Sequence, residues 1–422
     1  MGNTFCPNFL FFTDAPCGDL PAWRDTAAAV NGDKDKEAAL VREMISFAAE
    51  FSLSGNLWQH WLTWILMMHE NAFTLACERK AIDPDSVLSK LVQSDYESFL
   101  TLFRLDLRNI PGLAGLSALT SYDPPFEPYQ PNHAGKMILD LSEKLAQAKD
   151  LRSFSAVMET YYKDQGTGIY GMYKAFRIGG TPGDFRIVPV ADSTDVCFDD
   201  LIGLEDQKRT LKANTEAFLN GGHANNVLLY GDSGTGKSTS IHALMHDYFD
   251  RGLRLVELSK QDRKMLPQVL AEIKKRNYHF IIFLDDLSFE ENESDYKELK
   301  AMLEGALETR SDRVLIYATS NRRHLIRETW NDRKDMEYQD DIHHSDTMEE
   351  KLSLASRFGV TIYYPKPVPK EYLNIVHELS ARGGIDIDEK ELNDLARKWE
   401  LRHGGMTGRA ASQLITWLKG NY

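Results

Sequence analysis

Residues 231–238, GDSGTGKS, match the phosphate-binding pattern G-x-x-x-x-G-K-S/T. Glycines in such a loop let the backbone wrap around phosphates with its N–H groups pointing inward. A helix that begins near Lys237 adds the positive end of its dipole. The Lys237 side chain then reaches the β- and γ-phosphates, and the Ser238 hydroxyl binds Mg²⁺. The predicted nucleotide-binding residues here are Gly231, Asp232, Ser233, Gly234, Thr235, Gly236, Lys237, Ser238 and Thr239.

An acidic pair, Asp285 and Asp286, follows an apolar run at residues 280–284. A buried strand that ends there would deliver Asp285 to the Mg²⁺ shell of a bound nucleotide. Asp286 would then orient or deprotonate the water that attacks the γ-phosphate. An apolar run ending in two aspartates is weak evidence alone, but it is strong evidence downstream of a phosphate loop. Together the two motifs predict a site that binds ATP and Mg²⁺ and hydrolyses ATP.

The elements that must position these residues alternate between strands and helices from Phe198 onward. Helical stretches separate apolar, β-branched runs at 225–231, 253–259, 280–286, 314–321 and 360–365. This alternation predicts a parallel sheet covered by helices on both faces. After Pro365 and Pro367 the strands stop, and residues 370–418 have the pattern of helices only.

The region before the sheet, residues 1–163, has the pattern of a mostly helical domain. Good helix formers at amphipathic spacing fill residues 34–51, and further helices are expected at 136–148 and 154–163. An aromatic and apolar stripe on one helix face is typical of a domain core, and it comprises Trp58, Trp61, Trp64, Ile65 and Met68. Glycine and proline punctuate residues 164–195, which we interpret as a linker with one or two short strands.

These motifs resemble those of the AAA+ superfamily and, more closely, of the bacterial family called domain of unknown function 815. The closer resemblance rests on FDDLIG at 198–203, LLYGDSGTGKS at 228–238, DDLSFE at 285–290, YATSNRRHL at 317–325 and EEKLSLASRFG at 349–359. It is specific over residues 196–422 and only general before them. It implies an α/β fold: an AAA+ P-loop domain at 196–365, with a five-stranded parallel sheet between helices, and a helical lid at 366–422.

The resemblance also implies roles for residues outside the two motifs. Ile202 and Gly203 would pack against adenine, and Asn321 would be sensor 1, which positions the attacking water. Arg357 is similar to the arginine finger, which in this superfamily reaches the nucleotide of a neighbouring subunit. Arg409, in GMTGRAA at 405–411, is similar to sensor 2 of the lid. A finger that acts in trans implies self-association into a ring or a helical oligomer.

Two classes of function stay open for such an ATPase. One is a remodelling ATPase whose macromolecular client is selected by residues 1–163, and the other is a nucleotide-gated switch or loader. Most AAA+ motors have Glu where Asp286 stands, and the shorter side chain favours slow turnover. Residues 259–264 lack the aromatic, apolar and glycine trio of protein-threading rings. A small-molecule kinase is disfavoured, since it needs neither Arg409 nor Arg357.

Nucleic acid is a weaker candidate partner. Basic residues at 259–264, 274–276 and 322–323 could face it, although solvated helix faces are the better interpretation. The net charge of −14 over 422 residues argues against a protein that coats nucleic acid non-specifically.

Composition places the chain among ordinary globular proteins, with 42% hydrophobic and 27% charged residues. Its four cysteines are Cys6, Cys17, Cys77 and Cys197. They form no CxxC pair and have no zinc-site spacing, which predicts free thiols in a reducing cytosol. No apolar run has the length of a membrane helix, and the start lacks the basic residues of a signal peptide. A cytoplasmic protein without a membrane partner is therefore expected.

Overall fold

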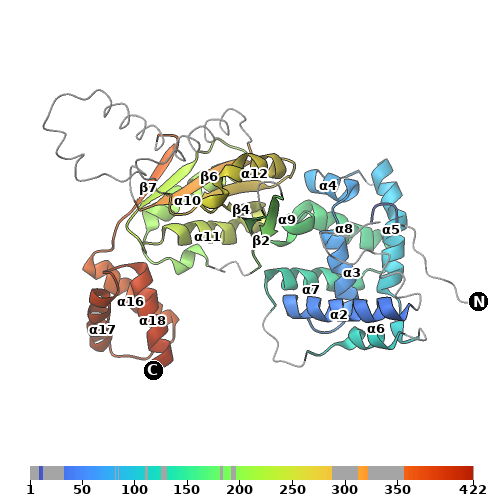
Figure 1. Ribbon diagram of the computed structural model, residues 1–422, viewed down its shortest axis with the longest axis horizontal. Coiled ribbons are helices and arrows are strands. Elements are labelled where there is room, and N and C mark those ends of the chain that lie inside the picture. Colours follow the sequence, from blue (N-terminus) through green and yellow to red (C-terminus); the bar gives the residue numbers. More distant parts are fainter. Residues whose placement is uncertain are drawn as a thin grey trace, which may run out of the picture. The chain divides into compact units, whose positions relative to one another are not determined.

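The computed structural model describes residues 9–12, 33–80, 82–83, 85–109, 113–124, 131–180, 184–191, 196–287, 312–321 and 356–421. The chain divides into two compact units. The helical unit is Met1–Lys174 with Pro189–Asp192, and the sheet unit is Ala175–Val188 with Ser193–Tyr422. Figure 1 labels their helices and strands. No helix among the described residues combines the length and the apolar character needed to cross a bilayer.

The helical unit is built from helices joined by short connections. They are α2 (Lys34–Phe51), α3 (Leu57–Met68), α4 (Ala72–Arg79), α5 (Val87–Phe103), η1 (Leu107–Asn109), α6 (Ala114–Ala118), η2 (Leu119–Ser121), α7 (His133–Ala146), α8 (Leu151–Asp164) and α9 (Gly168–Met172). Each longer helix begins after an Asp, Asn or Ser whose side chain accepts a free N–H of the first turn, and these caps are Asp33, Asn56, Asn71, Ser86, Asn132 and Asp150. The predicted helical N-terminal region is confirmed.

The core of this unit is centred on α3, in which every residue except Gln59 is buried. Trp61 and Trp64 pack against Phe47 of α2, with ring centroids 5.3 and 5.4 Å apart. The indole Nε1 of Trp58 donates a hydrogen bond to the Leu102 carbonyl at 3.0 Å. The predicted aromatic stripe is therefore part of the core, where large rings contribute much of the buried apolar area.

The sheet unit contains one sheet of seven strands in the order β2-β1-β4-β5-β6-β3-β7. The strands are β1 (Ala175–Gly179), β2 (Arg186–Pro189), β3 (Val227–Gly231), β4 (Leu253–Glu257), β5 (His279–Leu284), β6 (Val314–Ser320) and β7 (Val360–Tyr364). The five predicted strands, β3 to β7, pair in parallel, with β3 between β6 and β7. The predicted α/β class, with parallel strands between helices, is confirmed.

Two strands extend the sheet beyond the predicted five. β1 and β2 come from the segment that we interpreted as a linker, and β1 pairs in parallel with β4, where Ala175 lies opposite Leu255. They had escaped prediction as sheet members because β2 alternates between exposed and half-buried residues and has no continuous apolar run.

Helices cover the sheet, since parallel strands need crossover connections. They are η3 (Phe198–Asp200), α10 (Glu205–Leu219), α11 (Lys237–Tyr248), η4 (Phe249–Arg251), η5 (Gln261–Met265) and α12 (Leu266–Ile273). α11 packs against β3, β4 and β6, and α10 packs against β7. β5 is buried from Phe280 to Leu284, which places Asp285 at the end of a fully covered strand.

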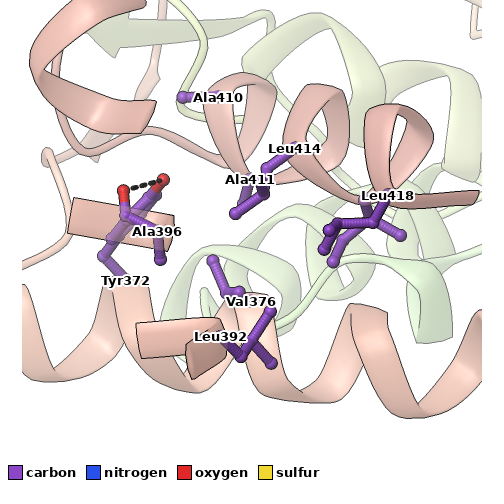
Figure 2. Close-up of a cluster of buried hydrophobic side chains, with 9 residues drawn as sticks. Tyr372, Val376, Leu392, Ala396, Ala410, Ala411, Leu414 and Leu418 are labelled. Atoms are coloured by element: carbon purple, nitrogen blue, oxygen red, sulfur yellow. Dashed lines mark hydrogen bonds between the residues drawn. The ribbon is translucent and has the colours of Figure 1, made fainter. Parts of the chain in front are cut away.

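The lid consists of α16 (Pro369–Arg382), α17 (Glu389–Arg402) and α18 (Gly408–Asn421). Its small core contains Val376, Leu392, Leu414 and Leu418, each no more than 3% exposed (Figure 2). The Tyr372 hydroxyl donates to the Ala396 carbonyl at 3.5 Å across the α16 and α17 pair. The three helices therefore share one buried core.

Candidate functional site

The loop between β3 and α11 follows the path that its glycines allow. Gly231 has a φ of +141°, and a Cβ there would lie 2.1 Å from the Tyr364 carbonyl oxygen of the neighbouring strand. Gly236 has a φ of +98° and immediately precedes α11. No side chain caps this helix, so the N–H groups of its first turn are available to an anion.

Lys237, the first residue of α11, lies inside this loop. Its Nζ donates to the carbonyl oxygens of Gly231 at 2.8 Å and Asp232 at 2.6 Å. It also donates to Asn321 Oδ1 at 3.1 Å. Burial lowers the pKa of the ammonium, although nearby aspartates oppose this shift. The loop thus holds a cation that is only 7% exposed where phosphates are expected.

Asp285 receives two hydroxyl groups on a single carboxylate oxygen. Ser238 Oγ donates to Asp285 Oδ1 at 2.7 Å, and Thr319 Oγ1 donates to the same atom at 2.6 Å. The serine and the aspartate present hard oxygen donors side by side. This donor set fits Mg²⁺, which binds through a few protein oxygens together with the phosphates of a nucleotide.

Asp286 has an unusual backbone conformation for a residue with a side chain. Its φ of +47° is in the left-handed region, which Asp and Asn tolerate better than most residues. Two contacts hold it there: its N–H donates to Thr319 Oγ1 at 2.9 Å, and Asn321 Nδ2 donates to its Oδ1 at 2.9 Å. Asn321 therefore connects Lys237 to Asp286 through the two ends of one amide.

Thr319 was not predicted from the sequence, yet its hydroxyl contacts both members of the acidic pair. It lies on β6 and is 2% exposed. The register places Leu284 of β5 opposite Ala318, so the next residues, Asp285 and Thr319, meet at the carboxyl edge. The signal was the alternation along β6, which puts Thr319 on the same face as Asn321.

A cavity of about 1330 Å³ contains most of the predicted site. Ser233–Thr239 of the loop line it, together with Ile202 and Gly203, Asp285 and Asp286, Asn321, and Arg409 of the lid. The lid touches the loop directly, because the Arg409 N–H donates to the Gly234 carbonyl at 3.3 Å. Apolar groups, including Leu201, Ile375 and Leu379, line the part of the cavity formed by the lid and by the segment before α10.

Some predicted residues lie elsewhere. Gly231 and Asp232 do not line the cavity, and Asp232 pairs with Lys366 at 3.6 Å. Arg357 lies just before β7 and does not line the cavity of its own chain. Of the basic segments, Arg263 and Arg276 are buried, while Arg322 and Arg323 lie outside the described residues.

Comparison with protein families matches residues 172–422 to the family described as "Protein of unknown function (DUF815)". No curated protein matched the chain. Among solved structures, the Thermotoga maritima RuvB Holliday junction branch migration motor is 17% identical, with a TM-score of 0.37. The match covers 52% of this chain and 63% of that one, which is less than two thirds of the RuvB chain.

Two further solved structures match a similar share of the chain. The FIGL-1 AAA domain in complex with ADP is 20% identical, with a TM-score of 0.37, and 52% of this chain and 72% of that chain are covered. C. elegans PCH-2 is 18% identical, with a TM-score of 0.37, and the match covers 53% of this chain and 65% of that chain.

Proposed function

The chain belongs to the family described as a protein of unknown function (DUF815), and we propose from the geometry of its cavity that it binds and hydrolyses ATP with Mg²⁺. The observation that carries this proposal is one connected set of hydrogen bonds. Asn321 joins the phosphate-loop lysine, Lys237, to Asp286, and Thr319 joins Asp286 to Asp285, which accepts from Ser238. These six residues meet at the carboxyl edge of the sheet, where α/β folds bind ligands.

In the bound state, the N–H groups of the loop and Lys237 hold the phosphates. Lys237 exchanges its present carbonyl partners for the β- and γ-phosphate oxygens, which are better acceptors because they are charged. Ser238 and Asp285 would hold Mg²⁺, which would supply positive charge against the phosphate oxygens. Ile202 and Gly203 contact adenine, and Arg409 reaches the γ-phosphate from the lid.

In the hydrolytic step, Asp286 accepts the proton of a water molecule whose oxygen bonds to the γ-phosphorus. The bond from that phosphorus to the β,γ-bridging oxygen breaks, and ADP and inorganic phosphate result. Asn321 orients Asp286 and the water. Arg357 acts on the nucleotide of an adjacent subunit in a ring or helical oligomer, where its guanidinium offsets the charge of the transition state.

ATP binding and hydrolysis drive or gate the remodelling of a macromolecular client. Residues 1–163 select this client. Residues 259–264 lack the aromatic trio of protein-threading rings, so polypeptide threading is disfavoured. Nucleic acid is a secondary candidate, and the burial of Arg263 and Arg276 leaves fewer cations for phosphate contacts.

A second function, a slow nucleotide-gated switch or loader, is favoured by the state of Asp286. Its carboxylate is short, is held by Asn321 at 2.9 Å, and stands on a backbone with a φ of +47°. A base in this arrangement reaches the attacking water less readily than a longer Glu, so ATP binding rather than turnover would control assembly.

The experiment that tests both functions measures ATP hydrolysis against protein concentration, with light scattering for the mass in the presence and absence of ATP. Specific activity that rises as a multimer forms supports the remodelling ATPase. A protein that binds ATP but barely turns it over at any concentration supports the switch. Stimulation by DNA or by an unfolded protein then identifies the class of client, and absence of ATP binding contradicts both functions.

A further inference from the structure

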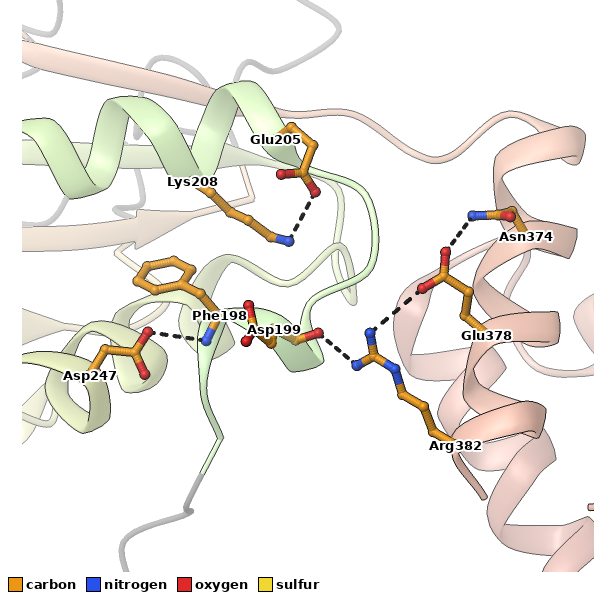
Figure 3. Close-up of polar contacts among 8 residues, drawn as sticks. All are labelled: Phe198, Asp199, Glu205, Lys208, Asp247, Asn374, Glu378 and Arg382. Atoms are coloured by element: carbon orange, nitrogen blue, oxygen red, sulfur yellow. Dashed lines mark hydrogen bonds and ion pairs between the residues drawn. The ribbon is translucent and has the colours of Figure 1, made fainter. Parts of the chain in front are cut away.

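The lid meets the rest of the sheet unit through polar contacts at two separated places. At the phosphate loop, the Arg409 N–H donates to the Gly234 carbonyl at 3.3 Å. At the far end of α16, Arg382 Nη1 donates to the Asp199 carbonyl oxygen of η3 at 2.6 Å (Figure 3). The Asp200 carboxylate lies 3.9 Å from the same guanidinium nitrogen. The nucleotide cavity is lined by residues next to both contacts.

η3 is a fixed support for the second contact. Phe198 is 1% exposed, its N–H points at Asp247 Oδ2 of α11 at 3.4 Å, and Lys212 Nζ of α10 lies 4.4 Å from the centre of its ring. Asp200 accepts hydrogen bonds from the backbone and thiol of Cys197, and these contacts hold the pKa of the carboxyl below its usual range. The segment that follows η3 continues directly into Ile202 and Gly203.

A stripe along α16 connects Arg382 to the cavity. Arg382 Nη2 lies 3.6 Å from Glu378 Oε2, and Asn374 Nδ2 donates to Glu378 Oε1 at 3.1 Å (Figure 3). Asn374 lines the cavity together with Ile375 and Leu379 of the same helix. Because α16 belongs to the common lid core, fixing Arg382 at η3 also fixes these residues in the cavity that Ile202 lines as well.

We propose that Arg382 is a positioning residue for the nucleoside part of the nucleotide. It holds the lid wall of the cavity at the distance from Ile202 and Gly203 that the base and ribose require, while the phosphate loop holds the phosphates without its help. The proposal rests on the proposed function, since it assumes that a nucleotide occupies this cavity. Removing the contact lowers the fraction of chains with a binding-competent lid, and the apparent affinity falls by the same factor.

The test compares two ligands, ADP and inorganic pyrophosphate, by calorimetric titration in the presence of Mg²⁺. ADP lacks the γ-phosphate that Arg409 is expected to contact, so the comparison isolates the nucleoside. In Arg382→Ala the Kd for ADP should rise about tenfold, as expected for the loss of one hydrogen bond to a charged group, while the Kd for pyrophosphate stays unchanged. Arg382→Lys keeps a charged donor and should recover part of the ADP affinity.

The matched control is Arg402→Ala, which removes an exposed arginine from α17 of the same lid and should leave both Kd values unchanged. Unchanged ADP binding in Arg382→Ala would overturn the proposal. An equal loss for ADP and pyrophosphate would also overturn it, because Arg382 would then support the whole unit rather than the nucleoside wall. If the wild-type chain binds pyrophosphate but not ADP, or binds neither, the proposed ATPase function itself fails. This outcome is seen in the wild-type chain, so it is distinguishable from a failure of the proposal about Arg382, which is seen only in the variants.

Discussion

Thr319 Oγ1 donates a hydrogen bond to Asp285 Oδ1 at 2.6 Å, and Thr319 Oγ1 also accepts the backbone N–H of Asp286 at 2.9 Å. One buried hydroxyl on β6 therefore orients both acidic residues at the end of β5. The hydroxyl keeps the Asp285 carboxylate beside Ser238, and it supports the left-handed backbone of Asp286. In the proposed mechanism, a group in this position would act on metal binding and on the attacking water at the same time.

Replacing this hydroxyl should weaken Mg²⁺-dependent turnover. Thr319→Val keeps the shape but removes both hydrogen bonds, so we expect kcat to fall about tenfold or more and the half-saturating Mg²⁺ concentration to rise. Steady-state hydrolysis measured across a Mg²⁺ titration checks this. Thr319→Ser keeps the hydroxyl and should stay near the wild type. A Val variant with normal Mg²⁺ dependence would remove Thr319 from the site.

The parts of the site that sequence alone could predict are those with a local pattern. The phosphate loop and the apolar strand before Asp285 are contiguous, and their residue types follow directly from the chemistry. Four of the five main strands, β3 to β6, were predictable because buried parallel strands are continuous apolar runs, and β7 was predictable from its β-branched and aromatic residues. A local pattern also predicted the lid helices, because their apolar residues recur at helical spacing.

The parts that escaped prediction depend on contacts between distant segments. Thr319 meets Asp285 only through the register of β5 with β6, and the lid reaches η3 through Arg382, which a sequence shows as an ordinary helix-end arginine. β1 joins the sheet beside β4 although a linker composition surrounds it. In each case the contact joins segments that are distant in the sequence, and short-range sequence patterns do not determine such contacts.

Lys237 should be indispensable for nucleotide binding. Its Nζ donates to two carbonyl oxygens of the loop and to Asn321 Oδ1 at the end of β6, and the phosphates would replace the two carbonyls. We expect Lys237→Ala to bring ATP binding below detection, since a buried charge-assisted contact and the charge balance of the loop are both lost. Equilibrium binding of a fluorescent ATP analogue measures this. Lys264→Ala, an exposed lysine of η5, is the control and should bind normally.

Asp286 should matter for chemistry and not for binding. Asp286→Asn keeps an oxygen that can accept from Asn321 Nδ2 and tolerates the same backbone conformation, but an amide does not take up a proton. We expect ATP affinity to stay within about twofold of the wild type, because no phosphate contact is lost, while single-turnover hydrolysis falls by at least about a hundredfold, the usual contribution of a general base. Rapid single-turnover hydrolysis by the variant would assign the base to another residue.

His60 should make the helical unit sensitive to mild acid. Burial lowers the pKa of its imidazole, and the ring contacts Ser142 Oγ at 3.0 Å and the Ser54 carbonyl at 3.1 Å. The unfolded chain therefore binds the proton more readily, so stability is complete above the ordinary pKa of about 6.5 and falls as pH drops below it. We expect His60→Gln to reduce this loss in thermal unfolding followed by tryptophan fluorescence between about pH 7.5 and 5.5. Identical pH profiles for the two proteins would contradict it.

Arg357 offers the sharpest distinction between an isolated subunit and an assembly. It stands before β7 and does not line the cavity of its own chain, so the proposed action on a nucleotide requires a neighbouring subunit. Arg357→Ala should therefore bind ATP as the wild type does at low concentration, yet lose the rise of specific activity with protein concentration. Mixing the variant with a chain that carries Asp286→Asn should restore some hydrolysis, because the Asp286→Asn chain supplies the finger and the Arg357→Ala chain supplies the base. Normal concentration-dependent turnover in Arg357→Ala would contradict a finger in trans.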